Sequence, residues 1–194
     1  LRAMSYVLLT EQWGLHFKPV WDGLSFFLEG ISDSEFSGFR ITRISVYGFV
    51  LYFCGCSVEW KSKGGKSVTL SSTEAEYVAL SETSKEILFV WQLLGSIGIY
   101  LEFPIIIKVD NVGAIYLANN QYTGAQTKHI DIRLHHIREY VEDGILKIVF
   151  VKSEYNDVDI LTKNTTGEMF LRNVLKIIHS KNKKRDGNPF SELE

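Results

Sequence analysis

Residues 70–80, Leu-Ser-Ser-Thr-Glu-Ala-Glu-Tyr-Val-Ala-Leu, divide the chain, because strand-like patterns precede them and a helix begins within them. Ser71 or Thr73 can cap this helix, and Glu74 and Glu76 follow these two residues at the spacing of a capping box. One glutamate suffices for a cap. The second lies where an inward-facing stripe begins, formed by Tyr77, Leu80, Ser84, Leu88 and Trp91. A carboxylate on the core side of a first helical turn needs a partner or a metal ion.

Size and composition favour a single globular domain with appendages. The chain has 194 residues, of which 45% are hydrophobic and 13% aromatic, and this excludes disorder throughout. The net charge of -2 argues against nucleic-acid binding through bulk positive charge but leaves room for a local basic face. Cys54 and Cys56 are separated by one residue, a spacing that rarely forms a disulfide, and they have no clustered partner for zinc, which fits a reduced, intracellular protein.

No apolar run reaches the roughly 18 residues that a membrane span requires. The first residues also lack the succession of basic, apolar and small segments of a signal peptide. Because the chain starts with Leu1 rather than Met, we expect it to be a piece of a longer polypeptide.

Three strand-like segments precede the helix, at residues 24–31, 46–53 and 57–60, and short connections make them antiparallel. Residues 61–66 read as a basic hairpin or loop. After the helix, expected at 73–94, the apolar segment 105–109 predicts a strand inside the sheet. The remaining predicted elements are a helix after Asn111, a helix at 127–141, a strand at 145–151 and a last helix starting near Asn156.

This order, β-β-β-α-β-α-α-β-α, predicts an α/β domain of two or three layers with a mixed sheet. The strand that enters the first helix and the strand that follows it are expected to pair in parallel or to share the parallel part. Residues 1–20 suggest the end of a helix running into an edge strand. Residues 179–194, with a basic run and an acidic end, suggest a flexible tail.

Four carboxylates stand at element boundaries. Asp33 follows a predicted strand, Glu76 begins the helix, Asp110 ends the apolar strand and Asp159 lies in the first turn of the last helix. If they meet at the carboxyl edge of the sheet, a divalent cation is needed to offset their repulsion. Hard oxygen ligands without clustered Cys or His favour Mg²⁺ or Mn²⁺ over zinc.

Each acid taken singly also has an ordinary structural explanation. Asp33 can belong to a turn, Glu76 to a capping box, Asp110 to a helix cap, and Asp159 can complement the helix dipole. Spacing alone therefore leaves both explanations open.

Five motifs occur together in this chain: Trp-Lys-Ser-Lys at 60–63, Ser-Ser-Thr-Glu-Ala-Glu-Tyr at 71–77, Asp-Asn at 110–111, Thr-Lys-His-Ile-Asp-Ile-Arg at 127–133 and Asp-Ile-Leu-Thr-Lys at 159–163. Together they resemble the ribonuclease H domain of copia-type retrotransposon polyproteins, over residues 15–175. The resemblance implies a ribonuclease H-like domain at 21–178 with a five-stranded mixed sheet flanked by helices. It also implies that residues 1–20 end the connection from the reverse transcriptase of the same polyprotein.

The resemblance further implies hydrolysis of the RNA strand of RNA–DNA hybrids during reverse transcription. Its metal-binding and catalytic acids would be Asp33, Glu76, Asp110 and Asp159, with Glu74 left as the capping residue. Two Mg²⁺ ions, or Mn²⁺ as a substitute, would act together. Asp33 would bridge both, Glu76 and Asp110 would hold the ion near the leaving oxygen, and Asp159 the ion that activates water. A virus-like particle in the cytoplasm, the nucleus, or both would be the location.

The sequence departs from the family pattern around the first acid, where residues 32–38 read Ser-Asp-Ser-Glu-Phe-Ser-Gly in place of Ser-Asp-Ala-Asp-Trp-Ala-Gly. Asp157 and Val158 precede the last acid where the family has an apolar residue and Ala. The loop 152–156 lacks the catalytic His of cellular ribonucleases H. A catalytically decayed module that binds nucleic acid or has a structural role is therefore the alternative function. A related DNA nuclease on the same fold is a third reading, and it should lack the 127–133 motif.

Hybrid binding would depend on local groups. The 2′-hydroxyl contacts are expected near Asn111 and the turn formed by Ser71, Ser72 and Thr73. The cations expected to meet phosphates are Lys61, Lys63, Lys66, Lys128 and Arg133. For each cation alone, a solvated surface position is the simpler explanation.

Overall fold

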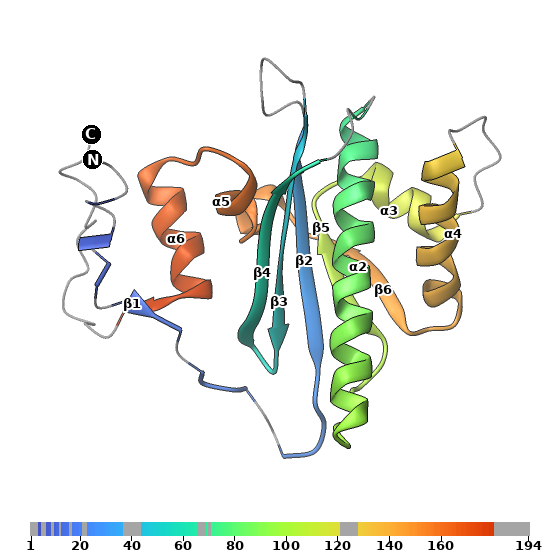
Figure 1. The fold of residues 1–194 in the computed structure, drawn as a ribbon, viewed down its shortest axis with the longest axis horizontal. Coiled ribbons are helices and arrows are strands. Elements are labelled where there is room, and N and C mark those ends of the chain that lie inside the picture. Colours follow the sequence, from blue (N-terminus) through green and yellow to red (C-terminus); the bar gives the residue numbers. More distant parts are fainter. Residues whose placement is uncertain are drawn as a thin grey trace.

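A five-stranded mixed sheet forms the centre of the protein (Figure 1). The computed structural model describes residues 4, 7, 8, 10, 11, 13–15, 17–20, 23–36, 44–65, 69, 71–120 and 128–180. The strands lie in the order β4-β3-β2-β5-β6. Their bounds are β2 Leu28–Glu35, β3 Val46–Phe53, β4 Cys56–Gly64, β5 Ile105–Val109 and β6 Leu146–Phe150.

The first three strands form an antiparallel meander, and the last two add to it in parallel. β2 pairs antiparallel with β3 and β3 with β4, as the short connections predicted. β5 pairs in parallel with β2 on one side and with β6 on the other. The expectation that β4 and β5 would pair in parallel or share the parallel part of the sheet is wrong, because β4 pairs only antiparallel with β3 at one edge and the chain crosses to the far side of β2. Parallel strands β2 and β5 therefore point their carboxyl ends toward the same edge of the sheet.

Helices cover both faces of this sheet, so the domain has three layers (Figure 1). On one face lie α2 (Ser72–Ser96), α3 (Val112–Asn119) and α4 (Lys128–Glu142). On the other lie α5 (Asp159–Thr162) and α6 (Gly167–Ile177). The short helix η1 (Ser153–Tyr155) connects β6 to α5.

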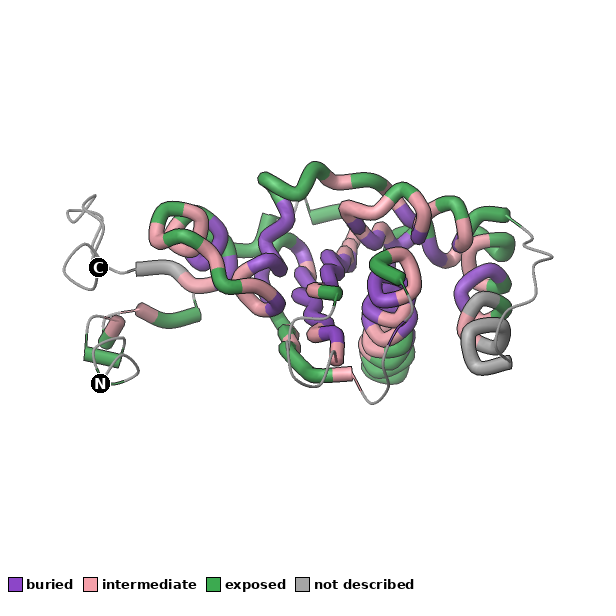
Figure 2. The backbone as a smooth tube through the Cα atoms, turned by 90° about the horizontal axis from the view of Figure 1, so that it is seen from above, coloured by how far each residue is buried: buried purple, intermediate pink, exposed green. Residues whose placement is uncertain are grey.

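Each face of the sheet has its own hydrophobic core. The larger one includes Phe49 and Leu51 of β3, Leu80 and Ile87 of α2, and Ile107 of β5. The smaller one joins β2 and β3 to the α5–α6 side. Figure 2 shows the buried residues along the sheet and on the sides of the helices that face it. Burial of apolar surface on both faces is the main stabilising contribution in such a layered domain.

Most predicted elements are found, and the differences follow from packing. β3 and β5 have the predicted bounds. β2 is shifted toward the C-terminus, so Asp33 lies inside a strand and not after it. β4 continues to Gly64, so the predicted loop at 61–66 is wrong for residues 61–64. The polar residues of this stretch belong to an edge strand that is exposed on one side, a pattern easily mistaken for a loop.

The predicted last helix near Asn156 is divided. Asn156 ends η1, and the helical residues that follow form the separate helices α5 and α6. Thr166 caps α6 by accepting a hydrogen bond from the Met169 backbone N–H (3.4 Å). The cap explains why the helix restarts there.

The two ends of the described chain meet in a small separate sheet. β1 (Trp13–Gly14) pairs antiparallel with β7 (His179–Ser180). The predicted flexible tail lies outside the described residues from position 181 onward. Within the described parts of the chain, no helix combines the length and apolarity needed to cross a bilayer.

Close approach of α5 to the sheet requires a glycine at position 48. A Cβ added to Gly48 would lie 3.0 Å from the Lys61 carbonyl oxygen and 3.0 Å from Thr162 Cγ2. We therefore expect Gly48→Ala to lower the free energy of unfolding by about 1–3 kcal/mol through overpacking. The midpoint of urea unfolding measures this change.

Gly95→Ala is the matched control, because an added Cβ there meets nothing within 4 Å and Gly95 lies inside α2. It should stabilise the protein by about 0.5–1 kcal/mol. Equal effects of the two substitutions would contradict the close approach of α5.

Candidate metal centre

Asp33 occupies the middle of the sheet. It pairs with Gly48 across the β2–β3 ladder, and none of its surface is exposed. β5 pairs with β2 only over Glu29–Ile31, so Asp33 lies just beyond the part of β2 that β5 covers. β2 pairs with β3 along its whole length, and it therefore holds the Asp33 carboxylate beside the carboxyl end of β5.

Asp110 reaches the same place from β5. It follows Val109, the last residue of the strand, and precedes Asn111, whose Oδ1 accepts a hydrogen bond from the Ala114 backbone N–H (3.0 Å) and caps α3. Asp110 Oδ2 accepts a hydrogen bond from the Ser153 hydroxyl (2.8 Å). A strand end, a helix start and a hydroxyl therefore fix the position of this carboxylate.

Glu76 comes from the first turn of α2. Ser71, and not Thr73, caps the helix by accepting a hydrogen bond from the Glu74 backbone N–H (3.1 Å). Glu76 then points toward the sheet and is 5% exposed. Its Oε1 accepts a hydrogen bond from the Ser34 backbone N–H (3.2 Å). The prediction of two unequal glutamates agrees with this geometry, since Glu74 adjoins the cap and Glu76 faces inward.

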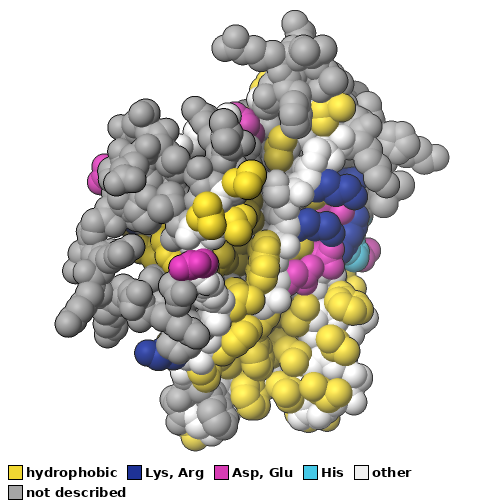
Figure 3. All heavy atoms as spheres, turned by 60° about the vertical axis from the view of Figure 1, so that its left-hand side comes forward, with side chains coloured by type: hydrophobic (Ala, Val, Ile, Leu, Met, Phe, Trp, Pro, Cys, Tyr) yellow, Lys and Arg dark blue, Asp and Glu magenta, His cyan; other side chains and the backbone are white. Residues whose placement is uncertain are grey.

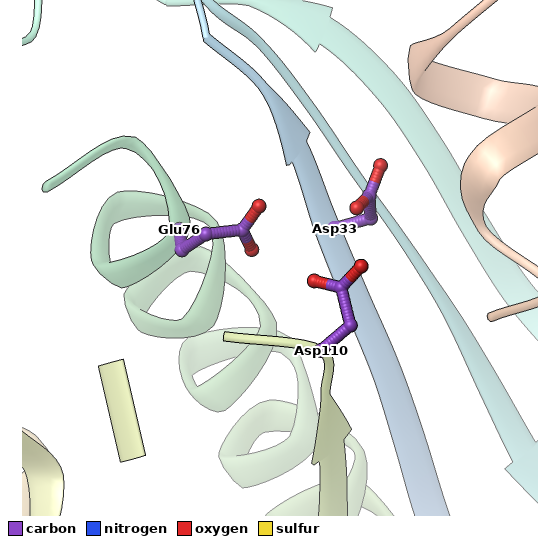
Figure 4. A group of neighbouring side chains, drawn as sticks. All are labelled: Asp33, Glu76 and Asp110. Atoms are coloured by element: carbon purple, nitrogen blue, oxygen red, sulfur yellow. The ribbon is translucent and has the colours of Figure 1, made fainter. Parts of the chain in front are cut away.

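These three acids form one cluster of oxygen ligands. Each offers a carboxylate oxygen, and the three oxygens lie within 4.8 Å of one another. Figure 4 shows the side chains approaching one another from β2, α2 and the end of β5. Oxygen-only ligand sets of this kind suit Mg²⁺ or Mn²⁺.

The electrostatics of the cluster favour a cation. Burial raises the pKa of the Asp33 carboxyl above its usual range, although Lys163 and Thr162 act in the opposite direction. Burial, and then the charges of Asp33 and Asp110, raise the pKa of Glu76 to about 8. A divalent ion among these oxygens would stabilise their charged forms and reverse this effect.

One buried atom supplies a test of whether a metal fits. Glu76 Oε2 is buried, and no described donor hydrogen-bonds to it. An unsatisfied buried carboxylate oxygen is costly unless something binds it. Since this atom belongs to one of the three clustered acids, the residues present fit a divalent ion held by Asp33, Glu76 and Asp110.

Asp159 lies beside this cluster but is not part of the three-oxygen group. It opens α5 and is 3% exposed. Its Oδ1 lies 2.9 Å from Lys163 Nζ, which is also 3.0 Å from Asp33 Oδ1. A lysine ammonium therefore stands between the first and the last of the four predicted acids.

The sequence reasoning did not single out several residues that hold the acids in place. The Thr162 hydroxyl donates a hydrogen bond to Asp33 Oδ2, and Lys163 contacts Asp33 and Asp159. Spacing could have paired Lys163 with Asp159, because residues four apart on a helix are neighbours. The contact with Asp33, across 130 positions, has no local signal.

The polar residues expected at the hybrid lie at two adjoining helix starts. Ser71 and Ser72 are exposed at the beginning of α2, and Asn111 caps α3. A Cβ added to Gly113 would lie 3.0 Å from both Asn111 Oδ1 and Thr73 Oγ1, so these two side chains border the same small space. This brings the expected 2′-hydroxyl contacts close to the acids.

The expected phosphate-binding cations are mixed with acids. Lys61 Nζ lies 2.7 Å from Glu86 Oε1, and Arg133 Nη1 lies 3.1 Å from Glu82 Oε1. Lys63 is exposed on β4. Figure 3 shows basic and acidic side chains intermixed on this face. Lys66 and the side chain of Lys128 lie outside the described part of the structure.

Sequence relatives of the chain include transposon polyproteins. Over 136 residues it is 39% identical to the retrovirus-related Pol polyprotein from transposon TNT 1-94 of Nicotiana tabacum, which covers 70% of this chain and 10% of that protein. Over 176 residues it is 35% identical to the Pol polyprotein from transposon RE1 of Arabidopsis thaliana. This alignment covers 91% of the present chain and 12% of that polyprotein. The chain thus spans about a tenth of the length of these curated relatives. No protein-family model matches the sequence.

Solved structures with the same architecture are ribonucleases H. LC11-RNase H1, isolated from compost, aligns with a TM-score of 0.50 and 18% identity over 67% of this chain and 87% of that one. Its structure in complex with an RNA/DNA hybrid aligns with a TM-score of 0.51 and 16% identity. That alignment covers 70% of this chain and 93% of the LC11-RNase H1 chain. The predicted ribonuclease H-like fold is confirmed, as is the predicted relation to Pol polyproteins of copia-type transposons.

The raised pKa of Glu76 predicts a pH-dependent stability in EDTA. Between the ordinary value of 4.5 and about 8, folded Glu76 binds a proton that the unfolded chain has lost. Stability should therefore fall as pH rises through this window, at up to about 1.4 kcal/mol per pH unit. Glu76→Gln should flatten the profile, as urea unfolding at a series of pH values would show. Superimposable profiles for the two proteins would contradict the assigned environment of Glu76.

Proposed function

Because this chain is a homologue of one segment of retrovirus-related Pol polyproteins and has the ribonuclease H fold, we propose that it hydrolyses the RNA strand of RNA–DNA hybrids during reverse transcription. The observation that carries this proposal is the cluster of Asp33, Glu76 and Asp110, whose oxygens lie within 4.8 Å of one another. It stands at the carboxyl edge of parallel strands, where open sheets of this kind place their ligands.

The acids would hold Mg²⁺, or Mn²⁺ in its place. Asp33, Glu76 and Asp110 would bind one ion, and Asp33 together with Asp159 would bind a second. Bound there, the ions supply an activated water and charge stabilisation at the leaving oxygen. The Ser34 backbone N–H and the Ser153 hydroxyl would orient Glu76 and Asp110 toward the metal, as hydrogen bonds to ligating carboxylates do elsewhere.

The hybrid would lie across the starts of α2 and α3. Exposed hydroxyls at Ser71 and Ser72, with Thr73 and Asn111 beside them, offer donors and acceptors next to the acids. Helix starts also attract phosphates through their free N–H groups. A structural neighbour, LC11-RNase H1, was solved with an RNA/DNA hybrid, which supports a hybrid as the substrate here.

The likeness to Pol polyproteins supports a reverse transcriptase domain of the same polyprotein as the partner. Such a domain would deliver the hybrid during reverse transcription, in a cytoplasmic virus-like particle, in the nucleus, or in both. The alternative is a catalytically decayed module, which would bind hybrids without cutting them. The departures from the family pattern around Asp33 and Asp159 support this alternative.

A cleavage assay with Asp110→Asn tests the proposal. Labelled RNA–DNA hybrid, duplex DNA and single-stranded RNA would each be incubated with Mg²⁺ and with EDTA. We expect wild-type protein to cut only the hybrid and only with Mg²⁺. Asp110→Asn should lower the rate more than about 100-fold, because a metal ligand should matter at least as much as the groups that orient one.

Asp143→Asn is the matched control, since Asp143 is exposed in the turn after α4 and the change of charge is the same. It should leave the rate unchanged. Hybrid binding without cleavage by wild-type protein would favour the decayed module, and cleavage of duplex DNA would favour a DNA nuclease. Unchanged cleavage by Asp110→Asn would contradict the metal centre.

The ion pairs around Glu82 and Glu86 should weaken hybrid binding. These acids hold Arg133, Lys85 and Lys61, which would otherwise be free to meet phosphates. Glu82→Gln combined with Glu86→Gln should therefore tighten hybrid binding. It should also steepen the dependence of log K on log salt by about 1 for each cation released. Fluorescence anisotropy at several salt concentrations in EDTA measures both quantities.

As the control, Glu139→Gln combined with Glu142→Gln removes the same number of charges from exposed positions on α4 and should have a smaller effect on affinity and slope. If the double variant and this control behaved alike, the expected phosphate contacts of Lys61 and Arg133 would be excluded.

A further inference from the structure

Lys163 occupies the space between two of the predicted metal ligands. Its Nζ lies 3.0 Å from Asp33 Oδ1 and 2.9 Å from Asp159 Oδ1. Asp33 is fully buried and Asp159 nearly so, whereas the Lys163 side chain is 31% exposed. The ammonium thus enters from the surface and its charge compensates two buried carboxylates at once.

The lysine divides the four acids into two electrostatic groups. On its side, both oxygens of Asp33 have partners, since Oδ1 faces Lys163 and Oδ2 accepts a hydrogen bond from Thr162. On the other side, Glu76 Oε2 is buried and receives no hydrogen bond from any described donor. An ion can therefore enter among Asp33, Glu76 and Asp110 without displacing a protein group. An ion between Asp33 and Asp159 would have to displace the Lys163 ammonium.

We infer that Lys163 is a built-in competitor for the second divalent ion. Its ammonium takes the position between Asp33 and Asp159 in the metal-free protein and has to swing toward solvent before an ion can bind there. This inference rests on the proposed function, because it takes Asp159 as a ligand of that ion. Lys163 is thus a positioning residue that makes metal loading sequential, with a tight first ion and a weak second one.

The same contact has a second consequence for the metal-free protein. Removing the ammonium leaves Asp33 and Asp159 buried close together without a counter-charge, which is strongly unfavourable. The lysine therefore also holds α5 against β2 when no metal is bound. A divalent ion between the two carboxylates could replace it in this role.

Calorimetric titration of the full chain with Mn²⁺, without nucleic acid, tests the inference. Wild-type protein should bind one ion tightly and a second weakly. Lys163→Met should bind the second ion more tightly by roughly tenfold or more, because the ion no longer has to displace an ammonium that is paired with both carboxylates. Thermal unfolding should show a lower midpoint for this variant in EDTA and a recovery with Mn²⁺.

Three variants complete the design. Lys163→Gln keeps a hydrogen-bond donor without the charge, and it replaces Lys163→Met if that variant does not fold in EDTA. Lys163→Met with Asp159→Asn should lose the tightened second ion. Lys147→Met removes an exposed cation from β6 and should bind Mn²⁺ as wild-type does.

A second ion of unchanged affinity in both Lys163 variants would overturn the inference. So would tightening that survives Asp159→Asn. Absence of hybrid cleavage by wild-type protein would contradict the proposed function alone, since the titration measures metal binding without any substrate.

Discussion

A fully buried carboxylate in the middle of a sheet is the constraint on which the rest of this structure depends. Asp33 faces Gly48 across the ladder and has no exposed surface. A charge in that position is tolerable only with partners, and the chain supplies them from the other end of the sequence through Thr162 and Lys163. Gly48 leaves the room that lets α5 bring these partners in. The buried charge of Asp33, the position of α5 and the glycine in β3 therefore depend on one another.

The acids on the other side of Asp33 follow from ordinary secondary-structure rules. Glu76 faces inward because Ser71 fixes where α2 begins, and Asp110 stands at the edge because β5 ends at Val109. Parallel pairing of β2 with β5 then places Asp33, which lies inside β2, next to the carboxyl end of β5. The three acids thus include an oxygen on Glu76 that has no described hydrogen-bond partner. Beside them, Asp33 and Asp159 already share the Lys163 ammonium. This contrast is the basis for treating the two metal positions as unequal.

Local patterns predicted what local physics controls. The sequence predicts strands at residues 46–53 and 105–109, and the structure has the same bounds, because a short, strongly apolar run between turn residues is typical of a buried strand. A cap needs only one of the two glutamates, which indicated that the other faces inward, and the family resemblance favoured Glu76 for that role. The position of Asp33 was not predicted, since its polar neighbours Ser32 and Ser34 suggest a turn, and only pairing with β3 makes the segment a strand. Lys163 belongs to the Asp-Ile-Leu-Thr-Lys motif, yet its contact with Asp33 depends on tertiary packing that no spacing reveals.

The central claim is that Asp33, Glu76 and Asp110 together bind a divalent ion. A crystal structure of the chain with Mn²⁺, with data collected at the manganese absorption edge, tests it most directly. The account predicts an anomalous peak among the three carboxylates, in contact with Glu76 Oε2, occupied before any peak appears between Asp33 and Asp159. A structure at saturating Mn²⁺ without a peak among the three carboxylates, or with an ion bound only elsewhere, would contradict it.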